Sequence, residues 1–331
     1  MAFDLEQLNS DCVCLTLDRR ALADRLQLDS DGAEVAELIA RERPTLLSDH
    51  PLFLAGRRAA AMAEIIAVIE RTIALPAFRQ TVLSDAPEIA RNEHGPVGIF
   101  MGYDFHLGSS GPRLIEINTN AGGALINAYL AEAQHACCDA IGRLVPPPDP
   151  LATLTQRFVS AFGEEWKRFG APRRLARIAI VDRTPSEQYL FPEFVLFKRL
   201  FERAGIDAVI ADPADLRFAE GRLQFDGAAI DLVYNRLTDF YFESADLGPL
   251  REAYLANAVA VTPNPHAHAL YADKRNLALL TDSDRLAAIG VGAADIAVLA
   301  AGIARTREVA GSAATELWQQ RSRLFFKPAR G

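Results

Sequence analysis

The 331-residue chain lacks the short motifs that mark the commonest nucleotide- and metal-dependent enzymes. It has no G-x-x-x-x-G-K-[ST] loop, no G-x-G-x-x-G turn, no H-E-x-x-H and no G-x-S-x-G. These absences exclude typical P-loop kinases, dinucleotide oxidoreductases, zincins and serine hydrolases. No apolar run approaches the length of a membrane span, and the acidic start MAFDLEQLNSD lacks the apolar core of a secretory signal. We therefore expect a cytoplasmic protein.

Cysteine is scarce, and its four residues form two close pairs, Cys12 with Cys14 and Cys137 with Cys138. Such pairs are poor frameworks for disulfides. A zinc site at His135, Cys137 and Cys138 is an alternative, but its spacing matches no common ligand pattern. Since free cysteine is usually buried as a small apolar residue, we expect all four to be packing residues.

Basic residues are in the minority, because 35 Lys and Arg oppose 43 Asp and Glu and give a net charge of −8. This balance argues against a nucleic-acid partner, but it leaves room for a local cationic site that binds a phosphate-bearing small molecule. The apolar fraction of 50% and the charged fraction of 24% are typical of a soluble globular protein. We expect small-molecule partners and no membrane, with a homodimer as an open alternative.

The most informative segment that is present is PRLIEINTNAGG, at residues 112–123. Glu116 and Asn118 are two positions apart, so in a strand both project from the same face. A carboxylate and an amide oxygen on one face suit Mg²⁺, which prefers oxygen ligands. The alternative is a buried polar pair that caps the helix starting near Ala124. Asn120 begins a turn with two glycines, where backbone can approach a substrate.

Hydrophobic periodicity divides the chain into four parts and predicts an α/β protein. Residues 1–92 form a helical N-terminal region. Residues 93–150 form a strand hairpin with the E-x-N motif and a helix, ended by a proline cluster. Residues 151–262 alternate strand, helix and strand, as in an open α/β domain whose ligands gather at the carboxyl ends of the strands. Residues 263–331 are mainly helical until RLFFKPARG, which we expect to be a strand.

Several polar residues follow the expected strands or interrupt apolar segments. Arg236 suits a carboxylate or phosphate, with a structural ion pair to Asp239 or another acid as the alternative. Gln188 suits a substrate amide, or caps the next helix. Lys327 ends an aromatic strand, where a lysine buried in a sheet is less expected and a phosphate partner is more expected. Lys274 lies on a helix and would ordinarily be a surface residue.

Five motifs together resemble those of one family. IEINTNAGG, DRTPSEQ, YNRLTDF, ADKRNL and FFKPARG occur in the order, and near the spacing, of motifs in the eukaryotic-type glutathione synthetases, which are permuted members of the ATP-grasp superfamily. The resemblance spans about residues 97–331. It implies a glutathione synthetase-like ATP-grasp fold with a helical N-terminal region, an open α/β substrate domain at 151–262 and an incomplete ATP-grasp part at 263–331.

The resemblance also implies roles for single residues. Glu116 and Asn118 match magnesium ligands, and Lys274 and Lys327 match two lysines that hold ATP phosphates. Arg236 matches an arginine at the substrate and the transferred phosphate.

Two further positions match residues that hold the substrate in this family. They are Asp182 and Gln188, in DRTPSEQ. The implied activity is ATP- and Mg-dependent carboxylate–amine ligation through an acylphosphate. The alternative is a non-catalytic ligand-binding or scaffolding protein that keeps the ATP-grasp fold.

Departures from the family pattern fall on substrate recognition and on the end of the chain. Gly102 replaces an arginine for the substrate carboxylate, NAGG replaces a serine-containing segment, and Asp239 replaces a tyrosine. We therefore leave the acid and amine substrates open. Since an ATP-grasp protein would begin its glycine-rich loop near Gly331, we expect the natural chain to continue and the 331-residue chain to be inactive alone.

Overall fold

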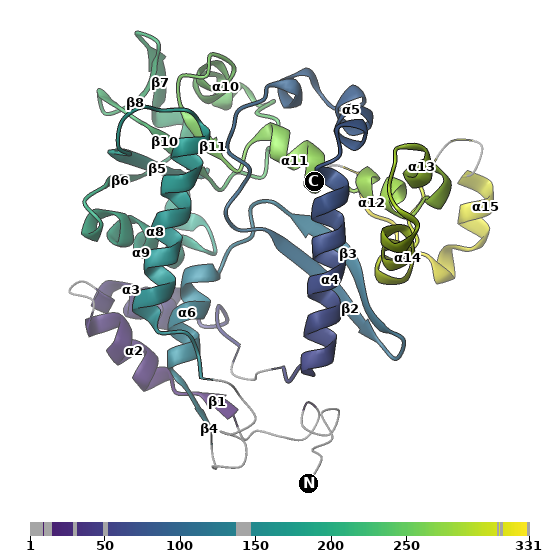
Figure 1. The fold of residues 1–331 in the computed structure, drawn as a ribbon. Helices are drawn as coiled ribbons and strands as arrows, with labels where there is room; N and C mark the ends of the chain where they lie inside the picture. Colours follow the sequence, from purple (N-terminus) through teal and green to yellow (C-terminus); the bar gives the residue numbers. More distant parts are fainter. Residues whose placement is uncertain are drawn as a thin grey trace.

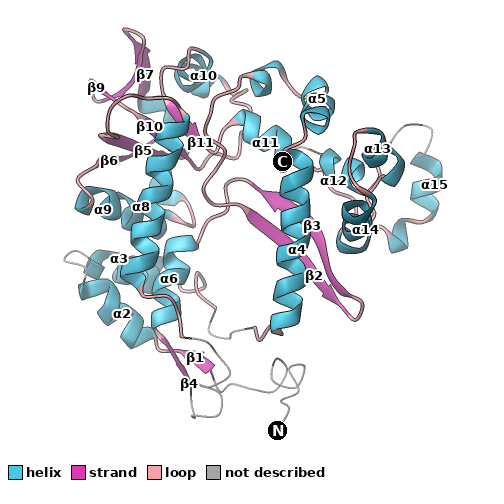
Figure 2. Cartoon of the chain, in the orientation of Figure 1, coloured by secondary structure: helices cyan, strands magenta, loops and turns pink. Residues whose placement is uncertain are grey.

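The computed structural model describes residues 9, 15–28, 32–48, 52–136, 147–309, 311 and 314–329. Within these ranges helices combine with both parallel and antiparallel strands (Figures 1 and 2), which confirms the predicted α/β class. Cys12, Cys14, Cys137 and Cys138 lie outside the described residues. None of the described helices combines the length and apolar character needed to cross a membrane.

The N-terminal region is mainly helical, as its periodicity predicts. Its elements are β1 (Leu15–Leu17), α2 (Arg19–Leu28), α3 (Gly32–Glu42), α4 (Gly56–Ile73) and α5 (Pro76–Ser84). Strand β1 pairs antiparallel with β4 (Gln134–Ala136). In α4 the buried residues include Ile65, Val68, Ile69 and Ile73, whose spacing of three and four places them on one helix face.

The E-x-N motif ends the second strand of an antiparallel hairpin made of β2 (Gly102–Gly108) and β3 (Gly111–Asn118). Helices α4 and α14 (Ala293–Gly302) pack against β3, where Leu114 and Ile117 are buried. The register pairs Phe105 with Leu114 and Asp104 with Glu116, so Ile115 is the extra residue of a β-bulge. The bulge shifts the alternation of side chains.

A parallel sheet with strand order β11-β10-β5-β6 lies at the centre of the α/β part. The strands are β5 (Arg177–Val181), β6 (Asp207–Ala211), β10 (Leu232–Asn235) and β11 (Ala260–Thr262). Side chains of one sheet face pack with α8 (Leu151–Arg168), α9 (Phe191–Arg203) and α6 (Ala124–Glu132). Those of the other face pack with α10 (Gly248–Leu255). Because both faces are covered, the strands are apolar almost throughout, as is usual for parallel sheets.

A small antiparallel sheet flanks this unit and contains the predicted turn at Asp226 and Gly227. It consists of β7 (Leu216–Ala219), β8 (Arg222–Phe225) and β9 (Ala228–Ala229). Both turn residues have positive φ, 54° and 74°, which is the backbone of a type I′ turn and explains the Asp-Gly pair.

The last part of the described chain is helical. It contains α11 (Pro265–Tyr271), α12 (Arg275–Leu280), α13 (Ser283–Ala288), α14 and α15 (Ala314–Gln319). The prediction of a strand at RLFFKPARG is wrong, because residues 324–328 have no regular secondary structure and no partner strand among the described residues. Phe325, which the predicted strand would have contained, is 85% exposed.

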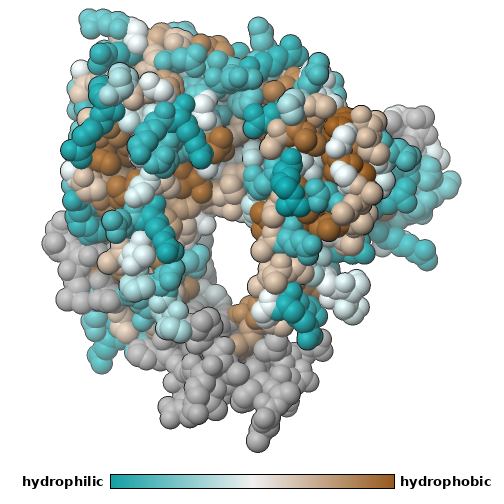
Figure 3. Space-filling view, in the orientation of Figure 1, coloured by the Kyte–Doolittle hydropathy of each residue, from teal (hydrophilic) through white to brown (hydrophobic). Residues whose placement is uncertain are grey.

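The space-filling view shows a deep hollow between the α6–α8 side and the α4 side of the molecule (Figure 3). The division into four domains is not decided by these elements and stays a prediction.

Candidate functional site

Three segments that are distant in the sequence meet at Glu116. The Lys327 Nζ lies 2.5 Å from Glu116 Oε2, and the Lys274 Nζ lies 3.4 Å from Glu116 Oε1. Lys274 also donates its backbone N–H to the Ala329 carbonyl at 3.2 Å. The structure therefore brings together one predicted metal ligand and both predicted phosphate-binding lysines, although their roles stay predictions.

The bulge at Ile115 contributes to this arrangement. The Lys327 Nζ lies 3.5 Å from the Ile115 carbonyl as well as beside the Glu116 carboxylate. Because Ile115 is unpaired with β2, its neighbour Glu116 points away from the buried face on which Ile117 lies. The local irregularity of the strand thus aims the carboxylate at the lysines.

The electrostatics of the group favour an anionic ligand. Partial burial alone would raise the pKa of the Glu116 carboxyl, but hydrogen bonds and charges from Lys327 and Lys274 lower it below its ordinary value. The carboxylate is therefore ionised at neutral pH. The two ammonium groups outnumber the one carboxylate that they contact, and the exposed Asp104 carboxylate lies opposite Glu116 in the hairpin. Ammonium groups placed in this way suit phosphate oxygens.

Asn118 faces an acid that sequence reasoning missed. Its Nδ2 donates to Asp104 Oδ2 at 3.4 Å, and Asp104 lies directly opposite Glu116 in the hairpin. Opposite residues of an antiparallel pair share a face, so two carboxylates and one amide oxygen lie on the same surface. This set of oxygen donors fits Mg²⁺. No group of three or more His, Cys, Asp or Glu ligands gathers anywhere in the described part of the chain.

A second group of predicted residues surrounds the turn after the E-x-N motif. Arg236 is only 7% exposed. It donates from Nη1 to the Asn120 carbonyl at 2.7 Å and to the Ala121 carbonyl at 3.3 Å. The Asn120 Nδ2 donates to the Leu237 carbonyl at 3.4 Å. These bonds join the end of β10 to the turn that follows β3.

The alternative ion pair between Arg236 and Asp239 is not what the structure shows. Asp239 accepts hydrogen bonds from the backbone of Glu243 and Ser244 and from the Ser244 hydroxyl, and lies 3.9 Å from Arg183. It therefore stabilises its own turn. The Nε of Arg236 is buried and has no hydrogen-bond partner among the described residues.

Asp182 and Gln188 both organise the loop after β5. Asp182 accepts the Arg183 N–H at 2.9 Å, and the Gln188 Nε2 donates to the Arg183 carbonyl at 2.6 Å. Burial raises the pKa of Asp182 to about 6, although the Arg183 N–H and the nearby Arg236 charge act in the opposite direction. Asp182 and Arg236 therefore share one environment at the carboxyl end of the sheet, while Gln188 is occupied by backbone.

This raised pKa predicts that Asp182→Asn stabilises the protein at neutral pH. In the folded state Asp182 keeps its proton up to about pH 6, against an ordinary pKa of 3.8. The stability that protonated Asp182 contributes is therefore fully present below pH 4 and is lost as the pH rises through 6. Allowing for partial solvent screening, we expect Asp182→Asn to gain about 1–2 kcal/mol at pH 7 and little at pH 4.

Urea unfolding of both proteins at the two pH values measures the difference. The same change at the exposed Asp215 is the matched control and should show no such pH dependence. An equal response of the two variants would refute the assignment.

Sequence reasoning also missed Glu193, which holds the helix that follows the turn. This residue of α9 is 1% exposed and accepts the N–H groups of Gly123 at 2.7 Å and Leu125 at 2.9 Å. A carboxylate at the first turn of α6 satisfies backbone donors that have no partner within the helix. The only signal in the sequence is one acid in the otherwise apolar run FPEFVLF.

Gly122 is required by close packing at the same place. A Cβ on Gly122 would lie 2.2 Å from Leu190 Cδ1 and 2.8 Å from the Arg236 Nη2. The turn can therefore approach Arg236 and α9 only without a side chain at this position.

Comparison with known proteins finds similarity in structure but not in sequence. No family model matches the chain, and no curated protein matches it by sequence. Among solved structures, the chain is similar to a glutathione synthetase-like effector from Globodera pallida in its apo form, with a TM-score of 0.52 and 14% sequence identity. The match covers 77% of this chain and 62% of that one, so the chain spans less than two thirds of that structure. At this identity the likeness is one of fold alone.

Proposed function

We propose that this protein is an ATP- and Mg-dependent carboxylate–amine ligase that forms an amide bond. The observation that carries the proposal is the contact of Lys274 and Lys327 with Glu116, since both lysines lie more than 150 positions after Glu116 in the sequence. The glutathione synthetase-like fold is consistent with this activity.

In this proposal the lysines exchange one anionic partner for another. In the structure both ammonium groups contact Glu116. The phosphate oxygens of ATP would attract the same ammonium groups and would free the carboxylate to hold a metal ion. Glu116, Asn118 and the opposing Asp104 would hold Mg²⁺, which would neutralise charge on the phosphates.

The reaction has two steps. A substrate carboxylate oxygen attacks the γ-phosphorus, and ADP leaves. The amine nitrogen then attacks the acyl carbon, loses a proton, and inorganic phosphate leaves. Lysine ammonium groups beside the reacting phosphate stabilise its developing charge, and fixed positions reduce the entropic barrier.

Arg236 has a positioning role in this scheme. Its guanidinium is buried, binds two carbonyls of the turn at residues 120–121 and lies over the Tyr234 ring at 5.5 Å. It therefore fixes the turn relative to Asp182 at the end of the neighbouring strand. Direct contact of Arg236 with the substrate stays a prediction from the sequence, because its guanidinium is buried and its Nη1 is bound to the turn.

Release of ADP by protein expressed from the complete gene tests the activity. With MgATP and panels of amino acids, polyamines and small carboxylic acids, we expect ADP to form only when an amine and a carboxylate are both present. Chelation of Mg²⁺ should abolish it. ADP formation that is independent of either substrate would instead indicate simple ATP hydrolysis.

The second candidate is a non-catalytic ligand-binding or scaffolding protein. The observation that favours it is that both oxygens of Glu116 are already bound to lysines, as in a purely structural ion-pair group. Calorimetry with MgATP on the same protein separates the two functions, because a structural group predicts no nucleotide binding. The ligase predicts saturable binding that weakens on Lys274→Ala.

A further inference from the structure

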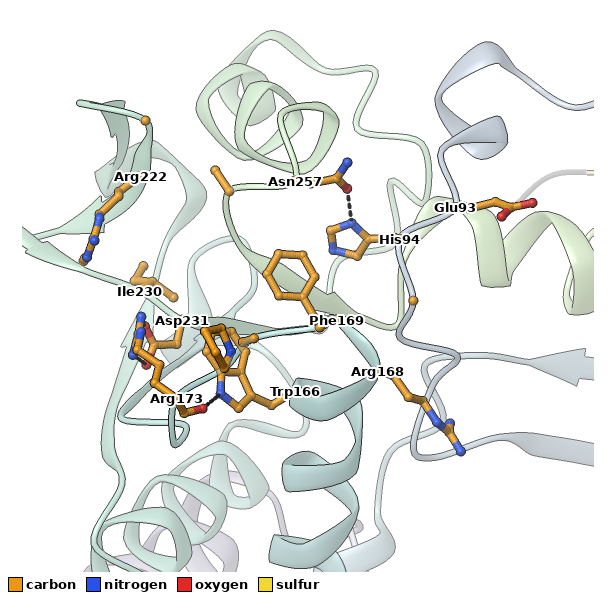
Figure 4. Close-up of a pocket in the computed structure, with 17 residues that line it drawn as sticks. Glu93, His94, Trp166, Arg168, Phe169, Arg173, Arg222, Ile230, Asp231 and Asn257 are labelled. Atoms are coloured by element: carbon orange, nitrogen blue, oxygen red, sulfur yellow. Dashed lines mark hydrogen bonds and ion pairs between the residues drawn. The ribbon is translucent and has the colours of Figure 1, made fainter.

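A cavity of about 600 Å³ is lined by residues outside the candidate functional site. Figure 4 shows it between the end of α8, the segment around His94 and the β8 strand. It lies at the amino ends of the parallel strands, because Asp231 immediately precedes β10 whereas Arg236 follows it. Its volume is in the range of small-molecule sites. None of the predicted site residues lines it.

The charged side chains of this cavity leave one positive charge without a partner. Asp231 is 5% exposed and accepts hydrogen bonds from Arg173, at 2.8 Å from its Nη1, and from the backbone of Ala176 and Arg177. Its charge is therefore balanced. The Arg222 guanidinium has no hydrogen bond or ion pair with any described residue, and Figure 4 places it on the same side of the cavity as Arg173.

The other charged residues at the rim do not cancel this charge. Arg168 pairs with Glu165 at 3.1 Å, and in Figure 4 both Arg168 and Glu93 point away from the centre of the cavity. In a protein with net charge −8, a cavity whose unbalanced group is a guanidinium attracts small anions.

Aromatic rings line the cavity from Trp166, over which the Arg173 guanidinium lies at 5.3 Å, to Phe169 and His94. Trp166 and Phe169 stack with ring centroids 5.7 Å apart, and the Phe169 ring lies 5.2 Å from that of His94. His94 accepts the Val261 N–H at Nε2 and bonds Asn257 through Nδ1, 3.1 Å from its Oδ1, so the neutral ring satisfies both partners. Burial lowers the pKa of His94 to about 4. The rings thus offer surface without charge of their own at neutral pH.

We propose that this cavity binds a small aromatic anion, with its charged group at Arg222 and Arg173 and its ring against Phe169. The charged group is a carboxylate or a phosphate ester, since a guanidinium binds both. The site is separate from the proposed ligase site, and its occupation does not depend on that activity.

Binding of three probes to the 331-residue chain tests the proposal. Benzoate and phenyl phosphate carry the two anionic groups, and benzamide is the uncharged analogue of benzoate. We expect saturable binding of at least one anion by calorimetry, with benzamide bound at least about tenfold more weakly. The tighter of the two anions identifies the charged group.

Trp166 locates the binding. Since the chain has two tryptophans, Trp318→Phe leaves Trp166 as the sole tryptophan. Its emission, excited at a wavelength where the seven tyrosines absorb little, should change over the same concentration range as the calorimetric signal. Trp318 is 65% exposed and outside the cavity, so its replacement should leave affinity unchanged.

Two charge-removing variants of one hairpin provide the decisive comparison. Arg222→Gln should weaken the anion at least about tenfold, whereas Arg217→Gln, on the neighbouring strand β7 and outside the cavity, should not. Both arginines are exposed, so neither change should alter the melting temperature. Equal affinities of the two variants, or no saturable binding of either anion up to about 10 mM, would overturn the proposal.

Discussion

Lys327→Ala is expected to lower kcat/KM for amine-dependent ADP release about 100-fold, because a cation that meets developing phosphate charge contributes about 3 kcal/mol to the transition state. The same change should hardly affect stability. Lys327 is 28% exposed, and its ammonium group contacts Glu116, the Ile115 carbonyl and, at 5.8 Å, the exposed Phe325 ring. Ion pairs of this kind contribute at most about 1 kcal/mol.

The separation of these two effects is what makes the variant informative. ADP release is measured on protein expressed from the complete gene, and the melting temperature is measured in parallel. Lys198→Ala is the matched control, since Lys198 forms an ion pair with Glu202 on the surface of α9. Unchanged kcat/KM in Lys327→Ala would remove the lysine from the reaction and favour the scaffolding function.

Glu193→Ala is expected to lower the free energy of unfolding by about 3 kcal/mol. The variant leaves the N–H groups of Gly123 and Leu125 without their acceptor in a buried place, and each unsatisfied donor costs about 1–3 kcal/mol. It also removes a negative charge from the N-terminal end of α6. Urea unfolding at pH 7 measures the loss.

Two further variants test this explanation. Glu193→Gln keeps one good acceptor oxygen and should lose less than Glu193→Ala. Glu202→Ala removes the same charge from the same helix at a position 42% exposed, and should change stability by less than about 0.5 kcal/mol. A loss in Glu193→Ala no larger than that in Glu202→Ala would show that the buried carboxylate does not hold the turn.

The bulge at Ile115 illustrates why the sequence predicted part of this site and not the rest. That Glu116 and Asn118 share a strand face follows from their spacing alone. That Asp104 joins them depends on the register of β2 and β3, and one unpaired residue changes which positions are opposite. Sequence spacing does not fix that register.

At the C-terminal segment the sequence predicted a strand that the structure does not contain. RLFFKPARG has the apolar and aromatic composition of a strand, but a strand forms only when another strand offers its hydrogen-bonding edge. No described strand lies beside residues 324–328. Lys327 is instead positioned by polar contacts with Glu116 and by the bond between Ala329 and Lys274.

The sequence by itself determined the α/β class, the Asp226–Gly227 turn and the common face of Glu116 and Asn118, because each depends on local periodicity or on backbone preference. Only the tertiary structure decided that Lys274 and Lys327 meet at Glu116, and that Arg236 and Glu193 hold the turn between the two groups. These contacts join residues more than 60 positions apart. Such partners are chosen by the packing of whole elements, which no short stretch of sequence encodes.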